Sequence, residues 1–158
     1  MTWRHRLIAF VLAAGPLLGI ASTAHAQSGS WIDINLSSQT ATAYDGDTPI
    51  RTVGVTTGRP GFATPTGTFS IQSRIANETM DSSTIGIPID SPGGYYLPNV
   101  YYTQYFDGSG DAIHANWWSP PGAFGSYPTS HGCVGMTTDD AAWFWNFADY
   151  GTPVVIHY

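Results

Sequence analysis

The sequence predicts one mainly β domain with a single short helix near its C-terminus. Short segments alternate apolar and polar residues, as half-buried strands do, and turn residues such as Asp and Gly separate them. Only one segment has apolar residues at helical spacing. Roughly 130 residues remain once an N-terminal leader is set aside, which is enough for one hydrophobic core.

The strand pattern recurs along the whole domain. Residues 31–36 alternate apolar and polar side chains, and the turn residues 45–47 separate the next two strand segments. The segment 95–106 is rich in aromatic and β-branched residues and is long enough for one or two strands. In chain order the predicted strands are 31–36, 40–44, 50–56, 67–71, 95–106, 111–115 and 152–157.

The predicted helix follows Thr137. Thr is a common N-cap residue, and Asp140, three positions later, completes a variant of the capping box with Asp in place of Glu or Gln. Gly151 is expected to end the helix, and Pro153 cannot continue it. The residues that share the apolar face of this helix are Ala141, Phe144, Trp145 and Ala148.

The N-terminus has the pattern of an export signal. Arg4 and Arg6 precede the apolar stretch 7–20, and Ala24 and Ala26 supply the small residues that a signal peptidase recognises. A retained membrane anchor is the alternative, but the stretch is short for a membrane span and is interrupted by Gly and Pro. We therefore expect export without stable membrane insertion. The predicted divisions are a signal peptide (1–26), a linker (27–30) and one domain (31–158).

After cleavage, the protein is strongly acidic. Arg51, Arg59 and Arg74 stand against eleven acidic residues, which gives a formal net charge of −8, and the chain has no lysine. Such a surface repels nucleic acid and anionic membranes, so neither is expected as a partner. It favours a cationic or amine-bearing substrate, although any soluble acidic exported protein has a similar surface.

Cys133 is the single cysteine of the chain. Exported proteins usually hold their cysteines in disulfide pairs, so an unpaired cysteine close to a histidine predicts a nucleophile. Because Cys133 comes shortly before the predicted helix, we expect the helix N-terminus to favour its thiolate and an oxyanion on an attacked carbonyl.

The mature chain keeps three histidines, His114, His131 and His157. Imidazole suits proton transfer near neutral pH, and proximity favours His131, two residues before Cys133, as the base. His157 is expected to be structural. A zinc site of His114, His131 and Cys133 has suitable ligand types, but no metal-binding motif accompanies them. We therefore expect neither a metal nor another cofactor.

Two motifs appear in order along the chain. Gly58 precedes the segment Thr64-Pro65-Thr66-Gly67-Thr68-Phe69, and His114 is followed by fifteen residues and then by Ser130-His131-Gly132-Cys133. Through these motifs the chain resembles the L,D-transpeptidase catalytic domain (YkuD family) over residues 31–158. The resemblance implies a β-sandwich with one short helix near the active site. It also implies a bacterial enzyme of the periplasm or cell wall whose substrates are peptidoglycan stem peptides.

The resemblance implies roles for individual residues. Cys133 attacks the carbonyl of the diamino acid at the third stem position and expels the terminal D-alanine, and an amine of a second stem then takes the acyl group in a 3→3 crosslink. His114 carries the proton, and the backbone carbonyl of Ala115 orients its ring. His131 and Gly132 shape the nucleophile turn, and the N–H groups of Gly132 and Cys133 form the oxyanion hole. The family pattern thus gives His114 the role that proximity gives His131.

The segment between His114 and Cys133 supplies candidates for substrate binding. Trp117 and Trp118 fall in a loop expected over the site, where they either form an aromatic wall for the stem peptide or pack on the domain. Ser130 of the motif is a third candidate.

One position departs from the family pattern. Many members have arginine two residues after the cysteine, where this chain has Gly135. Arginine is the natural bidentate partner of a carboxylate, so the departure removes one means of holding a substrate carboxylate or bracing the loop. The possible replacements are Arg51, Arg59 and Arg74.

Two alternative functions use the same residues or the same fold. Transfer of the acyl group to water would make the protein an L,D-carboxypeptidase, which no motif separates from a transpeptidase. A non-catalytic wall-binding module would keep the fold, although it would not need the intact Cys and His motif.

Overall fold

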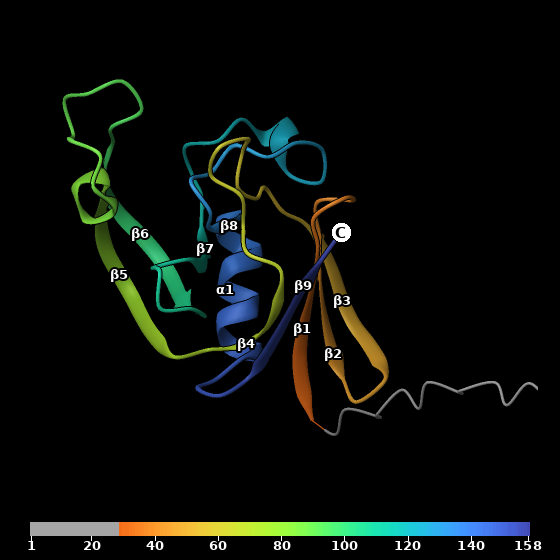
Figure 1. Cartoon of the computed structure of the whole chain (residues 1–158). Coiled ribbons are helices and arrows are strands. Elements are labelled where there is room, and N and C mark those ends of the chain that lie inside the picture. Colours follow the sequence, from red (N-terminus) through yellow and green to blue (C-terminus); the bar gives the residue numbers. More distant parts are fainter. Residues whose placement is uncertain (1–28) are drawn as a thin grey trace, which may run out of the picture.

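A computed structural model describes residues 29–158, which form two β-sheets, one α-helix and two short 3₁₀ turns (Figure 1). The predicted signal peptide lies outside the described residues, as do Gln27 and Ser28 of the predicted linker. Ser30, which the prediction placed in the linker, is the first residue of strand β1 (Ser30–Asn35). No helix within residues 29–158 is long and apolar enough to cross a membrane.

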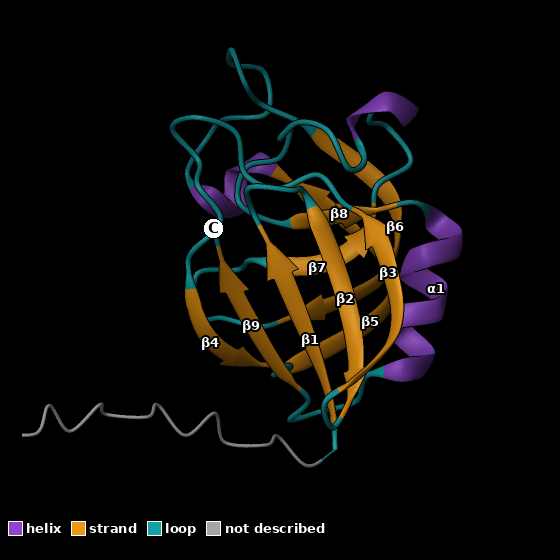
Figure 2. Cartoon of the chain, turned by 90° about the vertical axis from the view of Figure 1, so that its right-hand side faces the viewer, coloured by secondary structure: helices purple, strands orange, loops and turns teal. Residues whose placement is uncertain are grey.

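The first sheet has five strands and faces the viewer in Figure 2. Its central strand β1 pairs antiparallel with β2 and parallel with β9, so the first and last strands of the domain lie side by side. The outer strands pair antiparallel with their neighbours. In spatial order the strands are β3 (Thr48–Gly54), β2 (Thr40–Asp45), β1 (Ser30–Asn35), β9 (Pro153–His157) and β4 (Gly67–Ser70).

The second sheet has four strands, and its two short ones position the site. β6 and β7 are antiparallel, whereas β7 and β8 are parallel and need a crossover, the loop that contains the 3₁₀ turn η2 (Pro121–Ala123). The connection between β5 and β6 contains η1 (Ser82–Ile85) and projects beyond the rest of the molecule in Figure 1. In spatial order the strands are β5 (Ser73–Asp81), β6 (Tyr96–Tyr105), β7 (Ala112–Ala115) and β8 (Val134–Met136).

The core is built from residues of both sheets and of helix α1 (Thr138–Phe147), which packs against β6, β7 and β8. Ile32 of β1 and Met136 of β8 are fully buried, and Phe144 of α1 joins the same cluster. Burial of each such side chain stabilises the fold by about 1.5–3 kcal/mol. The facing strands are therefore fixed relative to each other, and with them the loops at their ends.

The helix begins as predicted but ends earlier. The Thr137 hydroxyl accepts the Asp140 N–H at 3.2 Å and donates to the Asp140 carboxylate at 2.7 Å. The helix ends at Phe147 instead of Gly151, which belongs to the turn before β9. Trp145, predicted on the apolar face, is half-buried and packs against Tyr102 and Arg74.

All seven predicted strands occur within a few residues of their expected bounds, and 95–106 is the single strand β6. Two strands lacked a sequence signal. β5 is largely polar and exposed along its length, so it has no buried period-two pattern. β8 is only three residues long and is buried at each position, which leaves no alternation to detect.

Candidate active site

The nucleophile turn at residues 130–133 is held together by its own hydroxyl and by the upstream motif. The Ser130 hydroxyl accepts the Gly132 N–H at 3.1 Å and donates to the Cys133 carbonyl at 2.5 Å. From outside the turn, the Thr64 hydroxyl donates to the Gly132 carbonyl at 2.6 Å and accepts the Gly58 N–H at 2.8 Å. The two sequence motifs therefore meet in space, and Ser130, predicted to bind substrate, has its hydroxyl engaged inside the turn.

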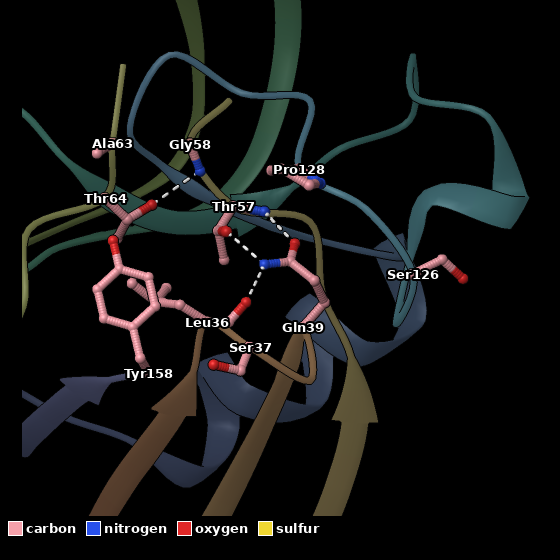
Figure 3. A pocket seen from close by; sticks show the side chains of 10 residues that line it. All are labelled: Leu36, Ser37, Gln39, Thr57, Gly58, Ala63, Thr64, Ser126, Pro128 and Tyr158. Atoms are coloured by element: carbon pink, nitrogen blue, oxygen red, sulfur yellow. Dashed lines mark hydrogen bonds between the residues drawn. The ribbon is translucent and has the colours of Figure 1, made fainter. Parts of the chain in front are cut away.

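A pocket lies beside Thr64, and the side-chain amide of Gln39 in its wall is hydrogen-bonded (Figure 3). The buried Gln39 side chain donates to the Leu36 carbonyl and to the Thr57 hydroxyl, both at 2.7 Å, and accepts the Thr57 N–H at 3.0 Å. This amide links the end of β1 to the strand connection that carries Gly58. The pocket wall thus supports the nucleophile turn from behind.

Strand register brings His114 to the nucleophile. In the parallel pair of β7 and β8, Ile113 lies opposite Val134 and His114 opposite Gly135, so Cys133 lies beside the start of β7. His114 is buried, and its Nδ1 lies 2.9 Å from the Ala115 carbonyl oxygen. Because a carbonyl only accepts, Nδ1 carries the proton and Nε2 has the free lone pair. Burial lowers the pKa of His114, which keeps the ring neutral at physiological pH, with a lone pair on Nε2.

Cys133 is partly buried among acidic groups. Its Sγ lies 3.9 Å from the Gly110 carbonyl oxygen. Burial, followed by the negative charge of Asp111, raises the pKa of the Cys133 thiol to about 12. The expectation that the helix favours a thiolate is therefore wrong. Strand β8 and Thr137 separate Cys133 from the helix, whose dipole acts only within its first turn.

Gly132 allows the acidic group to come this close. Its φ is +129°, a conformation that side chains other than glycine rarely adopt. A Cβ built on Gly132 would lie 2.1 Å from Asp111 Oδ1, so the carboxylate packs directly on the turn. The same turn limits the predicted oxyanion hole, because the Gly132 N–H is donated to Ser130. The Cys133 N–H has no acceptor among residues 29–158 and is the donor left for an oxyanion.

His131 is engaged elsewhere, although it is the histidine closer in sequence to Cys133. The two terminal nitrogens of Arg59 lie 3.1 Å from its Nδ1 and 2.6 Å from its Nε2. Its ring packs against Phe62 and Tyr95, with ring centroids 4.6 and 5.0 Å away. Burial and the Arg59 charge lower the pKa of His131. A guanidinium only donates, so it occupies the ring's lone pair, and the proximity argument for His131 as base fails.

The two tryptophans of the crossover loop have different surroundings. Trp118 stacks on the His114 ring, with centroids 5.6 Å apart and planes 21° from parallel, and so covers one face of the imidazole. Trp117 meets Trp118 edge-on and is 53% exposed. It lines an open hollow with Tyr101 of β6 and Thr138 of α1. Trp118 therefore packs at the site, and Trp117 is the one accessible to a peptide.

Gly135 is enclosed on both sides. Its N–H and carbonyl bond to the carbonyl and N–H of Thr56 at 2.8 and 2.9 Å. A Cβ at Gly135 would lie 2.6 Å from Nδ2 of the buried Asn116 side chain, so no arginine fits here. Of the three possible replacements, Arg51 pairs with Asp140 and Arg74 with Asp149, and only Arg59 contacts the nucleophile turn.

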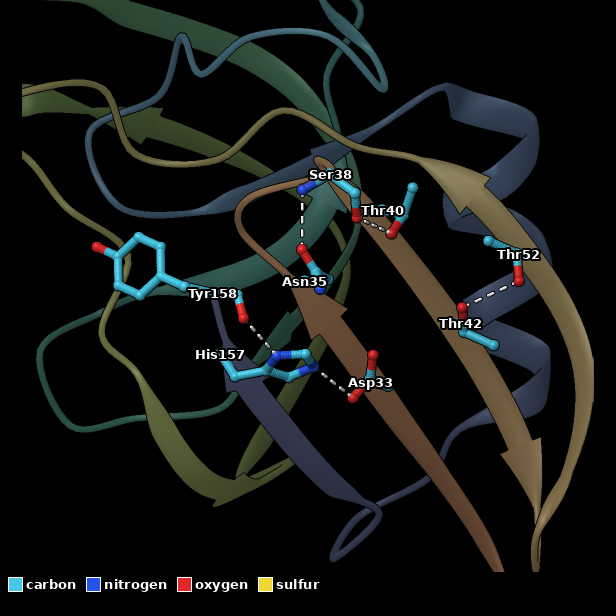
Figure 4. A network of polar contacts seen from close by, with 8 residues as sticks. All are labelled: Asp33, Asn35, Ser38, Thr40, Thr42, Thr52, His157 and Tyr158. Carbon is cyan, nitrogen blue, oxygen red and sulfur yellow. Dashed lines mark hydrogen bonds and ion pairs between the residues drawn. The ribbon is translucent and has the colours of Figure 1, made fainter.

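The third histidine lies apart from this site, on the surface of the five-stranded sheet (Figure 4). His157 Nε2 lies 3.0 Å from the Asp33 carboxylate, and Nδ1 lies 3.0 Å from the Tyr158 carbonyl. Both partners raise the pKa of His157, with the carbonyl as the larger cause. These contacts tie β9 to β1 and the chain end.

Sequence reasoning did not place Asp111 or Tyr95 at the site, and it named Arg59 only as one of three possible replacements for the family arginine. Asp111 and Tyr95 each open a predicted strand, so each had a structural explanation in the sequence. Arg59 directly follows the motif residue Gly58, which was the one available signal that it belongs near the nucleophile. Their positions depend on three loops that meet only in the folded chain.

We predict that Asp111→Asn changes how stability depends on pH. Burial and the charge of Asp107 raise the pKa of Asp111 to about 6, from 3.8. The fold thus disfavours the ionised form, so this carboxyl lowers stability as pH rises from 3.8 through 6. The variant should therefore be more stable than wild type above pH 6 and match it most closely below pH 4, as measured by thermal unfolding across this range.

Asp47→Asn is the matched control, because Asp47 is an exposed carboxylate in the turn between β2 and β3. It should shift the free energy of unfolding by less than about 0.5 kcal/mol at every pH.

Asp111→Asn should also lower the pKa of the Cys133 thiol, since it removes the charge that most strongly opposes a thiolate. Parallel pH profiles for wild type and Asp111→Asn would contradict the burial of this carboxyl.

Comparisons with known proteins agree with this geometry. The model of the YkuD family, described as the L,D-transpeptidase catalytic domain, matches residues 29–156. Probable L,D-transpeptidase 3 of Mycobacterium tuberculosis is 39% identical over 99 residues, which are 63% of this chain and 36% of that protein. L,D-transpeptidase 1 of the same species is 34% identical over 122 residues, 77% of this chain and 48% of that protein.

Solved structures show the same fold. L,D-transpeptidase LdtMt1 in complex with imipenem superposes with a TM-score of 0.78 at 32% identity, covering 82% of this chain and 59% of that one. L,D-transpeptidase 3 of M. tuberculosis with a faropenem-derived adduct gives 0.75 at 31% identity, covering 82% and 60%. This chain spans between about a third and a half of the length of the two curated relatives. The chain has two sheets and a His on the strand beside a Ser-His-Gly-Cys turn, and the family model matches nearly all described residues. The chain therefore belongs to the L,D-transpeptidase catalytic-domain (YkuD) family.

Proposed function

We propose that this protein is an exported peptidoglycan L,D-transpeptidase, which forms 3→3 crosslinks between stem peptides through an acyl-enzyme on Cys133. The observation that carries the proposal is the state of His114. Its Nδ1–H is fixed on the Ala115 carbonyl, and its Nε2 lone pair is free on the strand next to the nucleophile turn. The competing histidine is occupied by Arg59.

Acylation would proceed with His114 as the proton carrier. As Cys133 Sγ attacks the diamino acid carbonyl carbon, Nε2 of His114 takes the thiol proton, and the carbonyl oxygen becomes an oxyanion near the free Cys133 N–H. When the carbon–nitrogen bond breaks, His114 returns the proton to the departing nitrogen of D-alanine. A thioester remains on Cys133.

Deacylation reverses these roles. The amine of a second stem attacks the thioester carbon, His114 accepts a proton from that amine, and the carbon–sulfur bond breaks. The proton passes to the sulfur, so the thiol is regenerated and a new amide joins the stems. A neutral amine is required for attack, and a neutral His114 has a lone pair that can accept its proton.

The pKa values favour a resting thiol over a preformed ion pair. Because the pKa of Cys133 is raised to about 12 and that of His114 is lowered, both groups are neutral at pH 7. Proton transfer must then accompany attack, so the base contributes in the transition state itself.

The test is incubation of the mature protein with a disaccharide tetrapeptide, followed by mass spectrometry of the products. A transpeptidase should release D-alanine and form a crosslinked dimer, with the loss of one D-alanine per dimer. Release of tripeptide without dimer, at every acceptor concentration, would instead identify an L,D-carboxypeptidase. Retention of the intact tetrapeptide would leave the wall-binding module as the function.

A metal hydrolase is not supported by the geometry. Both ring nitrogens of His131 face the Arg59 guanidinium, so this histidine has no free lone pair for a zinc ion. The same incubation in the presence of a chelator distinguishes the two chemistries, because Cys/His acyl transfer should proceed at an unchanged rate.

A further inference from the structure

Arg59 carries a positive charge without a carboxylate partner in a strongly acidic protein. Arg51 lies 2.6 Å from the Asp140 carboxylate, and Arg74 lies 3.0 Å from Asp149. Arg59 has no ion pair within residues 29–158, and residues 1–28 contain no Asp or Glu. Its charge is therefore uncompensated in the described domain, which is unusual where acidic residues outnumber arginines.

The contacts of Arg59 hold it at the nucleophile turn but leave its charge available. Its backbone N–H donates to the Ser130 carbonyl at 3.0 Å, and its guanidinium packs 4.6 Å from the centre of the Phe62 ring. The guanidinium contacts to the Thr129 and Ser130 carbonyls are long, at 3.4 Å each. Its short contacts are to the His131 ring, which is neutral because its pKa is lowered.

Tyr95 connects this guanidinium to the nucleophile. Its ring packs on His131 on one side of the turn. The pKa of Tyr95 is raised, chiefly by burial and then by Cys133, whereas Arg59 lowers it. Because the Arg59 guanidinium also contacts the Ser130 carbonyl, an anion bound at Arg59 would be held beside the nucleophile turn that ends at Cys133.

We propose that Arg59 is a specificity-determining residue that binds a carboxylate of the donor stem peptide. This inference rests on the proposed function. A guanidinium presents paired N–H groups that match the two oxygens of a carboxylate, and such charge-assisted bonds are about twice as strong as neutral ones. Arg59 also brings a guanidinium to the nucleophile turn, which position 135 cannot do because Asn116 fills the space beside Gly135. When the diamino acid of the donor is diaminopimelic acid, the donor offers two carboxylates, one on the terminal D-alanine and one on the diamino acid side chain.

Three tetrapeptide donors separate these sources. One has both carboxylates free, one has the D-alanine carboxylate as a carboxamide, and one has the diamino acid carboxylate as a carboxamide. Release of the C-terminal residue is followed by mass spectrometry to obtain kcat/KM for each. Wild type should use one carboxamide donor about 10–100-fold less well than the free donor, which identifies the carboxylate that Arg59 binds.

Arg59→Met should lower kcat/KM for the free donor by about 10–100-fold and leave the value for that same carboxamide donor within about twofold of wild type. Arg59→Lys keeps the positive charge but not the paired N–H groups, so its kcat/KM for the free donor should lie between those of wild type and Arg59→Met. Arg51→Met is the matched control, because it removes an arginine bound to Asp140 of α1, and it should leave the donor preference unchanged.

An equal loss on all three donors in folded Arg59→Met would overturn the proposal and show that Arg59 only braces the turn. Equal use of all three donors by wild type would overturn it as well, without any variant. Neither result touches the proposed function, which is tested separately by whether wild type forms the crosslinked dimer from the free tetrapeptide.

Discussion

Replacement of Cys133 by alanine is expected to abolish release of D-alanine from a tetrapeptide donor and to abolish adduct formation with imipenem. The thiol is the only cysteine of the chain, so no second sulfur can take over the acyl group. Loss of the nucleophile of a covalent mechanism lowers kcat on the order of 10⁴-fold or more. The measurement is intact-protein mass spectrometry after exposure to imipenem, together with single-turnover assays.

The adduct gives this experiment a clear control. Wild type should gain the mass of one imipenem molecule, and thiol titration of the unfolded protein should find one reactive thiol before exposure and none afterwards. Cys133→Ser retains the size of the side chain and should fold with an unchanged circular dichroism spectrum. A mass gain in Cys133→Ala equal to that of wild type would show that another group is acylated.

The same thiol illustrates how far the sequence predicts the site. Its proposed role as the nucleophile follows from its solitude and its motif. Strand β7, which carries His114, lies where it was predicted, whereas the adjoining strand β8 had no sequence signal. The protonation state of the resting thiol does not follow from the sequence. The predicted influence was the helix four residues later, whereas the thiol pKa is raised first by burial and then by Asp111, which a local pattern cannot bring to Gly132.

The roles of the histidines also depend partly on local sequence and partly on long-range packing. The Ala115 carbonyl that orients His114 is its sequence neighbour, so a local motif is enough to specify it. The partner of His131 is Arg59, seventy-two positions away, and it reaches the ring through the connection between β3 and β4. Spacing of two residues therefore suggested a Cys133–His131 pair that long-range packing prevents. Non-local contacts of this kind need the fold.

The second large effect is expected from His114→Ala, which should slow acylation of Cys133 by about 10²–10⁴-fold, the usual contribution of general-base catalysis. The variant removes the free Nε2 lone pair, whereas the turn around Cys133 is held by Ser130 and Thr64 and should remain intact. His131→Ala should reduce the rate less, because it removes only a partner of Arg59. Single-turnover acylation by imipenem or a tetrapeptide donor measures both.

The pH profile distinguishes a lost base from a disturbed structure. Because burial lowers the pKa of His114 below 6.5, wild-type acylation should rise with pH through a midpoint below 6.5 and then level off as the ring becomes neutral. His114→Ala should lose this step. His131→Ala should keep it at a reduced rate, and His157→Ala, on the distant sheet surface, should match wild type. If folded His131→Ala is inactive while His114→Ala acylates at nearly the wild-type rate, the proton passes through His131 and the guanidinium contact must open during the reaction.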